Sequence, residues 1–234
     1  MPRLIESISE DDDQLLWPEA GDTVFGDGDP SRPGVAALRW LGGVLPQWRA
    51  YAQGFRVAAD ALGKFIIVES EARGLVQPRI DEIALPLVAL WRHYLELTLK
   101  ALIPELDDLS YGPDTPLPHS HNLKQLWELA EPALRELAGH DDAFDAVKAA
   151  VMEFDRLDPK GEVFRYPVSI KGVWSLSELP ETLDVKHLVD EMQAVANFFD
   201  GSWGAIDAQQ EMRHEEAVYR AENADRSEAY GGPG

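Results

Sequence analysis

The chain has 234 residues, of which 45% are hydrophobic, so it is long enough to bury the core of one large domain. Its formal net charge of -21 at pH 7 repels polyanions at long range, so a nucleic acid needs a local basic patch to bind. The absence of cysteine excludes disulfide bonds and thiolate metal sites.

The beginning of the chain lacks the pattern of an export signal. The first residues and the acidic run Asp11 to Asp13 do not have the basic and then apolar order of a signal peptide. No apolar run reaches the roughly 18 uncharged residues that a membrane span needs. We therefore expect a cytoplasmic protein with no membrane partner. Residues 1–34 are rich in Asp, Gly and Pro and are predicted to be a flexible acidic segment.

Helical periodicity begins at Val35, where Ala36 to Leu41 form a short helical piece. Further apolar residues recur at intervals of three and four. They predict helices over 47–72, from about 80 to Pro104, and over 123–137, 141–157 and 185–199. Because proline is unfavourable in a helix interior, Pro104 is expected to end the second of these helices. Gly201 to Gly204 are expected to break the last one, before a frayed charged helix over 209–226.

Residues 158–177 differ from the helical remainder. They alternate between apolar and polar residues near Val163 to Tyr166 and contain a Lys171-Gly172 turn, which predicts a short extended or hairpin insertion. The expected fold is all-α, an antiparallel four- to five-helix bundle with this insertion and loose acidic termini. The expected parts are a flexible segment over 1–34, the bundle over 35–204 and a charged tail over 205–234.

The helix that begins near Ile80 carries its polar residues on one side. Arg92, His93, Glu96 and Lys100 fall within about 100° of one another on a helical wheel, while apolar residues cover most of the remainder. Arg92 and Glu96 have the spacing of an ion pair. The stripe is either a solvated edge or a functional groove whose charges are held on a rigid helix.

Three short patterns follow one another along the chain. The first is Trp91 to Lys100, the second is His121-Asn122-Leu123 at a helix start, and the third is Phe164-Arg165-Tyr166-Pro167. In this order they resemble the HEPN superfamily of small antiparallel helical bundles, over about residues 80–199. The resemblance implies a metal-independent RNA endonuclease of bacterial antiviral-defence or toxin–antitoxin type. Alternatively, it implies a non-catalytic regulatory subunit that binds a nucleotide or a protein partner.

For a nuclease, the candidate catalytic residues are Arg92, His93, His121 and Arg165. RNA cleavage by the 2′-hydroxyl needs a base that titrates near neutrality, which either histidine supplies, and a cation for the developing phosphorane charge, which the arginines supply. Glu96, Lys100 and Tyr166 are expected to support them. In the structural alternative, His121 caps a helix and Arg165 forms an ion pair with Glu96.

The chain departs from the catalytic HEPN pattern, in which an arginine and a polar residue are followed, after four to six residues, by a histidine. Arg92-His93 opens this pattern, but the next histidine is His119. Arg135 and His140 have the spacing, but they straddle a helix end and are interpreted as a coincidence. This departure and the net charge favour the non-catalytic alternative.

The remaining expectations concern ligands and partners. His119 and His121 lie two residues apart in a proline-rich loop and no zinc-binding helix motif occurs, so we expect neither metal nor cofactor. RNA or a nucleotide, a protein partner and a second copy of the chain are the expected partners. Trp174 is the aromatic residue most suited to a partner contact. A further hypothesis, an acidic mimic that occupies a basic surface, depends on net charge alone.

Overall fold

The structure is a computed structural model that describes residues 29, 31–34, 36, 44–73, 77–110, 118–138, 142–169 and 171–230. The chain divides into two units, Met1–Leu41 and Gly42–Gly234. The flexible segment predicted up to residue 34 and the helical piece predicted at 36–41 lie almost entirely outside the described residues. In the described part of the first unit, the Asp29 side chain accepts hydrogen bonds from the backbone N–H and the hydroxyl of Ser31.

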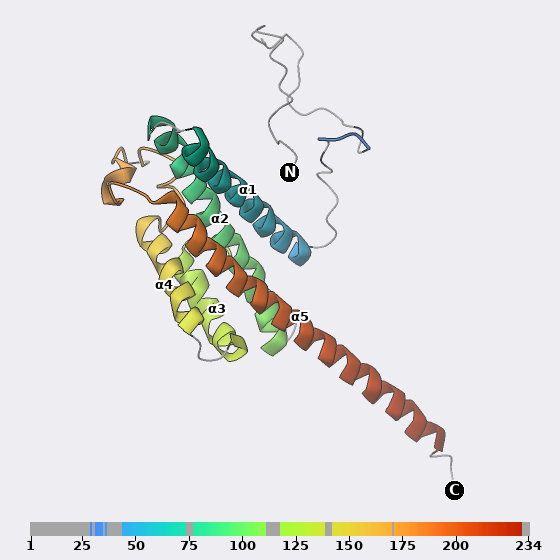
Figure 1. Cartoon of the computed structure of the whole chain (residues 1–234). Coiled ribbons are helices and arrows are strands. Elements are labelled where there is room, and N and C mark those ends of the chain that lie inside the picture. Colours follow the sequence, from blue (N-terminus) through green and yellow to red (C-terminus); the bar gives the residue numbers. More distant parts are fainter. Residues whose placement is uncertain are drawn as a thin grey trace, which may run out of the picture. The chain divides into compact units, whose positions relative to one another are not determined.

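The described part of the second unit is a bundle of five α-helices with one short 3₁₀ helix (Figure 1). The elements are α1 (Val44–Arg73), α2 (Gln77–Ser110), α3 (Leu123–Ala138), α4 (Asp142–Leu157), η1 (Ser175–Glu178) and α5 (Val185–Tyr230). No strand occurs among the described residues, and the prediction of an all-α bundle is confirmed.

Helix α2 is the centre of the bundle. It packs against α1, α3 and α5, and Figure 1 shows it between α1 and the pair α3 and α4. Trp91, Leu95, Leu99 and Leu102 are completely buried. A helix with apolar residues on several sides removes most surface from water when neighbours cover each side, which explains its central position.

Helix α2 continues through Pro104 to Ser110, so the predicted end at Pro104 is wrong. A proline in a helix interior removes one backbone hydrogen bond and costs roughly 3 kcal/mol. Ile103 and Leu106, on either side of it, are buried in the core. Burying these side chains offsets the lost hydrogen bond, since each contributes about 1.5–3 kcal/mol.

Helix α5 runs without interruption from Val185 to Tyr230, so the predicted break at Gly201 to Gly204 is also wrong. The residues beside the two glycines pack on the bundle, since Trp203 and Ile206 are buried. The Ser202 hydroxyl donates to the Phe198 carbonyl at 3.0 Å and satisfies its polar group within the helix. No helix end therefore separates the bundle from the predicted tail over 205–234.

The segment between α4 and α5 reverses direction but forms no strand in its described part. Val168 and Trp174 make one isolated antiparallel bridge. Gly172 closes the turn with a φ of 74°, a backbone conformation that glycine adopts without strain. The predicted insertion is therefore an irregular loop with a single bridge, followed by η1.

Candidate functional site

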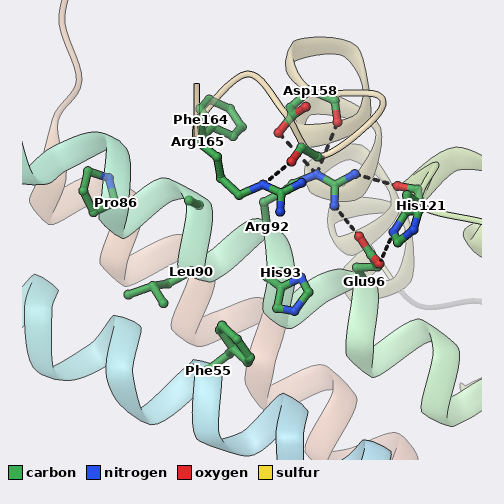
Figure 2. Close-up of a pocket in the computed structure, with 12 residues that line it drawn as sticks. Phe55, Pro86, Leu90, Arg92, His93, Glu96, His121, Asp158, Phe164 and Arg165 are labelled. Carbon is green, nitrogen blue, oxygen red and sulfur yellow. Dashed lines mark hydrogen bonds and ion pairs between the residues drawn. The ribbon is translucent and has the colours of Figure 1, made fainter. Parts of the chain in front are cut away.

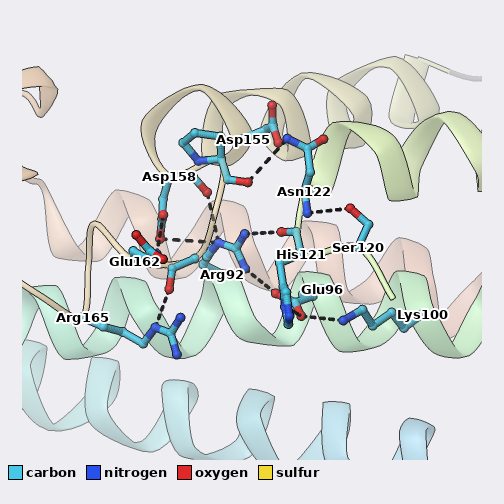
Figure 3. A network of polar contacts seen from close by, with 12 residues as sticks. Arg92, Glu96, Lys100, Ser120, His121, Asn122, Asp155, Asp158, Glu162 and Arg165 are labelled. Carbon is cyan, nitrogen blue, oxygen red and sulfur yellow. Dashed lines mark hydrogen bonds and ion pairs between the residues drawn. The ribbon is translucent and has the colours of Figure 1, made fainter. Parts of the chain in front are cut away.

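Arg92 on α2 lies at the centre of a buried polar network (Figure 3). Only 3% of the residue is exposed. Its Nη1 donates to Glu96 Oε2 at 2.5 Å, its Nη2 to the His121 carbonyl at 2.6 Å and its Nε to the Asp158 carbonyl at 3.2 Å. The same Nε lies 3.5 Å from Asp158 Oδ2. All three nitrogens of the guanidinium are thus engaged within the protein.

Glu96 is the second member of the network and is also 3% exposed. Its Oε1 accepts from Lys100 Nζ at 2.8 Å and lies 2.7 Å from His121 Nδ1. Burial opposes ionisation of this carboxyl, but the hydrogen bonds from Lys100, Arg92 and His121 outweigh burial and lower its pKa from 4.5 to about 2. Glu96 is therefore ionised at neutral pH. The polar stripe of α2 is a buried ion-pair network and is not a solvated edge.

The loop before α3 covers one side of this network. Asn122 caps α3, because its Oδ1 accepts from the Gln125 backbone N–H at 2.8 Å. Its own N–H donates to Ser120 Oγ at 3.0 Å, and its side-chain amide donates to the Pro159 carbonyl at 3.4 Å. The cap thus fixes the carbonyl of the preceding His121 over Arg92. The residue that caps α3 is therefore Asn122 and not His121, whose ring faces Glu96.

The loop after α4 covers the other side. Asp158 is 1% exposed, and its Oδ1 accepts from the backbone N–H groups of Glu162 and Val163 at 2.7 and 3.1 Å. Gly161 has a φ of 71°, and a Cβ added there would lie 2.9 Å from Arg92 Nη1. The backbone at Gly161 therefore lies directly against the guanidinium, so a side chain at this position would have to displace Arg92.

Neither Asp158 nor Gly161 is among the residues expected from the sequence. One signal could have indicated Asp158: an acidic residue directly after the C-terminus of α4 faces the negative end of the helix dipole. Such a placement is unfavourable unless a cation or N–H groups compensate, as Arg92 and the loop backbone do here.

A cleft of about 550 Å³ opens beside the network (Figure 2). Its apolar lining comes from α1, α2 and the loop after α4. These apolar residues are Phe55, Pro86, Ala89, Leu90 and Phe164. The polar lining includes His93, His121 and Arg165, together with the buried Arg92, Glu96 and Asp158. The structure therefore brings all four candidate catalytic residues to one cleft.

The two histidines of the cleft have different surroundings. His93 is partly buried and its ring meets Phe55 edge-on, with centroids 4.3 Å apart. Burial lowers the pKa of His93 below its usual 6.5 against the opposing charge of Glu96, so this imidazole is neutral at pH 7. The His121 side chain is 69% exposed. Its Nδ1 faces a carboxylate and therefore carries the proton, which leaves Nε2 as the acceptor in the neutral ring.

Arg165 is exposed at the cleft, and its Nε donates to the Gly161 carbonyl. Its guanidinium lies over the Tyr166 ring, 5.7 Å from the centroid. In the part of the chain that the structure describes, Arg165 forms no ion pair with a carboxylate, and the expected pair with Glu96 is absent. The Nη atoms of Arg165 are thus available to a ligand.

The supporting residues divide between the interior and the surface. Lys100 is buried beneath Glu96, and its Nζ lies 5.8 Å from the centroid of the Trp48 ring. Tyr166 is exposed and does not line the cleft. Among the described residues, no group of three or more His, Asp or Glu side chains is arranged to hold a metal ion. No described helix has the length and hydropathy needed to cross a membrane.

Comparisons of the chain with protein-family models, curated proteins and solved structures found no match. The resemblance to HEPN proteins therefore stays a prediction from the three motifs.

Proposed function

We propose that this protein is a non-catalytic HEPN-like module that binds a nucleotide in the cleft beside Arg165. The observation that carries the proposal is the contrast between the two arginines. Arg92 is buried, with every nitrogen bonded inside the protein, whereas Arg165 is exposed with its Nη atoms available. A clamp of two arginines on one phosphate would need Arg92 to leave a network that holds two loops.

The lining of the cleft suits a ligand with a flat apolar part and an anionic part. Phe55, Leu90 and Phe164 provide surface for a base. The Arg165 guanidinium provides the planar pair of donors that a phosphate accepts. The volume of about 550 Å³ lies within the range of small-molecule sites, roughly 300–1,000 Å³. The net charge of -21 also repels a nucleotide with a few phosphates less strongly than it repels a long RNA strand.

Nucleotide binding is tested by calorimetric titration of the intact chain with ATP, ADP and AMP. We expect saturable binding to wild type, and a dissociation constant at least about tenfold higher for Arg165→Ala, since hydrogen bonds to charged groups contribute roughly 1.5–3 kcal/mol. Lys171→Ala is the matched control, because Lys171 is an exposed cation of the same loop that does not line the cleft. No binding by wild type, or equal losses in both variants, would overturn the proposal.

A metal-independent RNA endonuclease is the second candidate. The observation that favours it is that a neutral His93 and an exposed His121 line the same cleft as Arg165. A neutral imidazole can accept the proton of a 2′-hydroxyl, and Arg165 could bind the scissile phosphate. A role in bacterial defence or toxin regulation follows for either candidate from the resemblance alone.

The two candidates are separated by incubating total RNA with the protein in the presence of a chelator. The proposed module leaves the RNA intact. Cleavage that is lost in His93→Ala and His121→Ala, with both variants folded by circular dichroism, would replace the proposal by the nuclease. Arg92→Ala is unsuitable for this assay, because Arg92 holds the loops in place.

A further inference from the structure

The charges of the network beside the cleft cancel one another. Arg92 and Lys100 are paired with the buried carboxylates of Glu96 and Asp158, so these four groups together carry no net charge. Burial lowers the pKa of His93, which keeps its imidazole neutral at pH 7. A ligand in the cleft therefore meets no free charge from any of these five side chains.

Arg165 is the positive charge that this balance leaves over. Among the described residues that line the cleft, it is the one cation without a carboxylate partner. His121 adds no second free cation, because its Nδ1 lies 2.7 Å from Glu96 Oε1 and any charge on the ring faces that carboxylate. The cleft thus offers a ligand a single uncompensated positive charge, within a chain of net charge -21.

The free donors of Arg165 form a pair. Its Nε donates to the Gly161 carbonyl, which leaves the two Nη atoms at the end of the planar guanidinium. These donors match two oxygens on one phosphorus atom, in the fork geometry of arginine–phosphate contacts. A phosphodiester has two non-bridging oxygens and one negative charge, whereas a terminal phosphate has three oxygens and carries roughly -1.5 to -2 near pH 7. Arg165 therefore matches a diester in both geometry and charge.

The apolar part of the cleft offers a surface to one base. The rings of Phe55 and His93 meet edge-on, and Figure 2 shows Leu90 on the same side of the cleft. Aromatic and aliphatic side chains of this kind bind the flat face of a base, whichever base it is. A cyclic mononucleotide presents one base and one diester, which is the combination that this cleft can contact.

On the basis of the nucleotide site proposed above, we propose that its ligand is a cyclic mononucleotide, whose single diester charge is matched by Arg165. Each further charge of AMP, ADP or ATP meets no free cation among the described lining residues and is repelled by the net charge of the chain. The affinity should therefore fall in the order cyclic AMP, AMP, ADP, ATP. A site built for triphosphates gives the opposite order, because several N–H groups and cations surround the phosphates there.

Calorimetric titration of the intact chain measures this order, without divalent cations so that each nucleotide keeps its full charge. At an ionic strength of about 0.01 M, the dissociation constant of 3′,5′-cyclic AMP should be at least about tenfold lower than that of ATP. Raising the ionic strength to about 0.15 M shortens the screening length from about 30 Å to about 8 Å, so ATP binding should strengthen relative to cyclic AMP binding. ATP that binds as tightly as cyclic AMP would overturn the cyclic ligand and leave nucleotide binding intact. No binding of any nucleotide would overturn the proposed function as well.

A cation added to the cleft tests the same charge balance. Pro86 is an exposed residue of the cleft inside α2, where proline is unfavourable, so Pro86→Lys introduces a charge without removing a buried side chain. This variant should improve ATP binding about tenfold and cyclic AMP binding by a smaller factor. Pro132→Lys is the matched control, because Pro132 is an exposed proline inside α3 that does not line the cleft. Equal effects of the two variants on ATP binding would overturn the charge balance of the cleft as the cause.

A linear dinucleotide separates a cyclic ligand from a segment of RNA. ApA has the same diester charge as cyclic AMP but two bases, and it should bind less tightly because the cleft has a surface for one base. Arg165→Lys keeps the charge and loses the fork, so it should weaken cyclic AMP binding about tenfold. Tighter binding of ApA than of cyclic AMP would overturn the cyclic ligand. Unchanged binding of cyclic AMP to Arg165→Lys would overturn the paired contact with the diester oxygens.

Discussion

Arg92 Nε donates to the Asp158 carbonyl at 3.2 Å, across 66 positions of sequence. Through this contact helix α2 holds the loop that follows α4, and through the His121 carbonyl it holds the loop that precedes α3. The guanidinium is thus a structural connection between three parts of the bundle, and the two loops that it holds form a wall of the cleft.

Replacing this connection should destabilise the fold. Arg92→Ala leaves Asp158 as a buried carboxylate without its cation and removes one of the two cations paired with Glu96, and removing one partner of a buried ion pair costs about 3–5 kcal/mol. Urea unfolding followed by circular dichroism measures this loss. Arg220→Ala is the control, because its pair with Glu216 is exposed and should contribute at most about 1 kcal/mol. Equal stability of Arg92→Ala and wild type would show that the network is not structural.

The pH dependence of stability should report the buried Glu96. Its pKa is about 2 in the folded protein and about 4.5 in the unfolded chain, a difference that corresponds to about 3 kcal/mol. Because the folded-state pKa is lowered, this contribution is fully present above pH 4.5. It is lost as the pH falls from 4.5 towards 2, where the unfolded chain takes up the proton first.

Glu96→Gln removes this dependence. The free energy of unfolding of the variant should fall well below that of wild type at pH 7, and the difference should shrink as the pH is lowered from 4.5. Urea titrations at several pH values between 7 and 3 provide the measurement. Gly54→Ala changes no charge, so its difference from wild type should stay constant over this range. A constant difference for Glu96→Gln as well would contradict the assigned ionisation.

Gly161→Ala should be more destabilising than Gly172→Ala. Both glycines have positive φ, 71° and 74°, and an alanine in this region costs about 1–2 kcal/mol. The added Cβ meets the Arg92 guanidinium at Gly161 and no atom within 4 Å at Gly172. The difference between the two unfolding free energies therefore isolates the contact with Arg92. Equal losses would mean that the guanidinium moves aside freely.

Gly63 should be intolerant of alanine because of the packing of α1 on α5. A Cβ at Gly63 would lie 2.5 Å from Val189 Cγ2. Overpacking of this kind costs about 1–3 kcal/mol. Gly54→Ala, on the open side of the same helix, should instead stabilise by up to about 1 kcal/mol. Thermal unfolding compares the two variants, and Val189→Ala combined with Gly63→Ala should recover part of the loss. No recovery in the double variant would exclude the contact with Val189 as the cause.

Local patterns predicted the positions of the helices well, and they failed where packing competes with local preference. The predicted starts and ends of α3 and α4 lie within a residue of the observed ones. Pro104 and Gly201 were expected to interrupt helices, and both lie inside them. Their neighbours Leu106 and Trp203 are buried. Burial of such side chains outweighs the unfavourable residue, and its extent depends on neighbouring helices distant in sequence.

The sequence by itself determined the fold class, because intervals of three and four between apolar residues suit only helices that pack together. It also determined that Arg92, Glu96 and Lys100 share one side of α2, because residues four apart lie on one helical face. Only the tertiary structure decided that two loops bury this side, while Arg165 stays exposed. Burial depends on His121, Asp158 and Gly161, whose backbones meet Arg92 only when α3 and α4 are packed in place. No periodicity along the chain encodes such a contact.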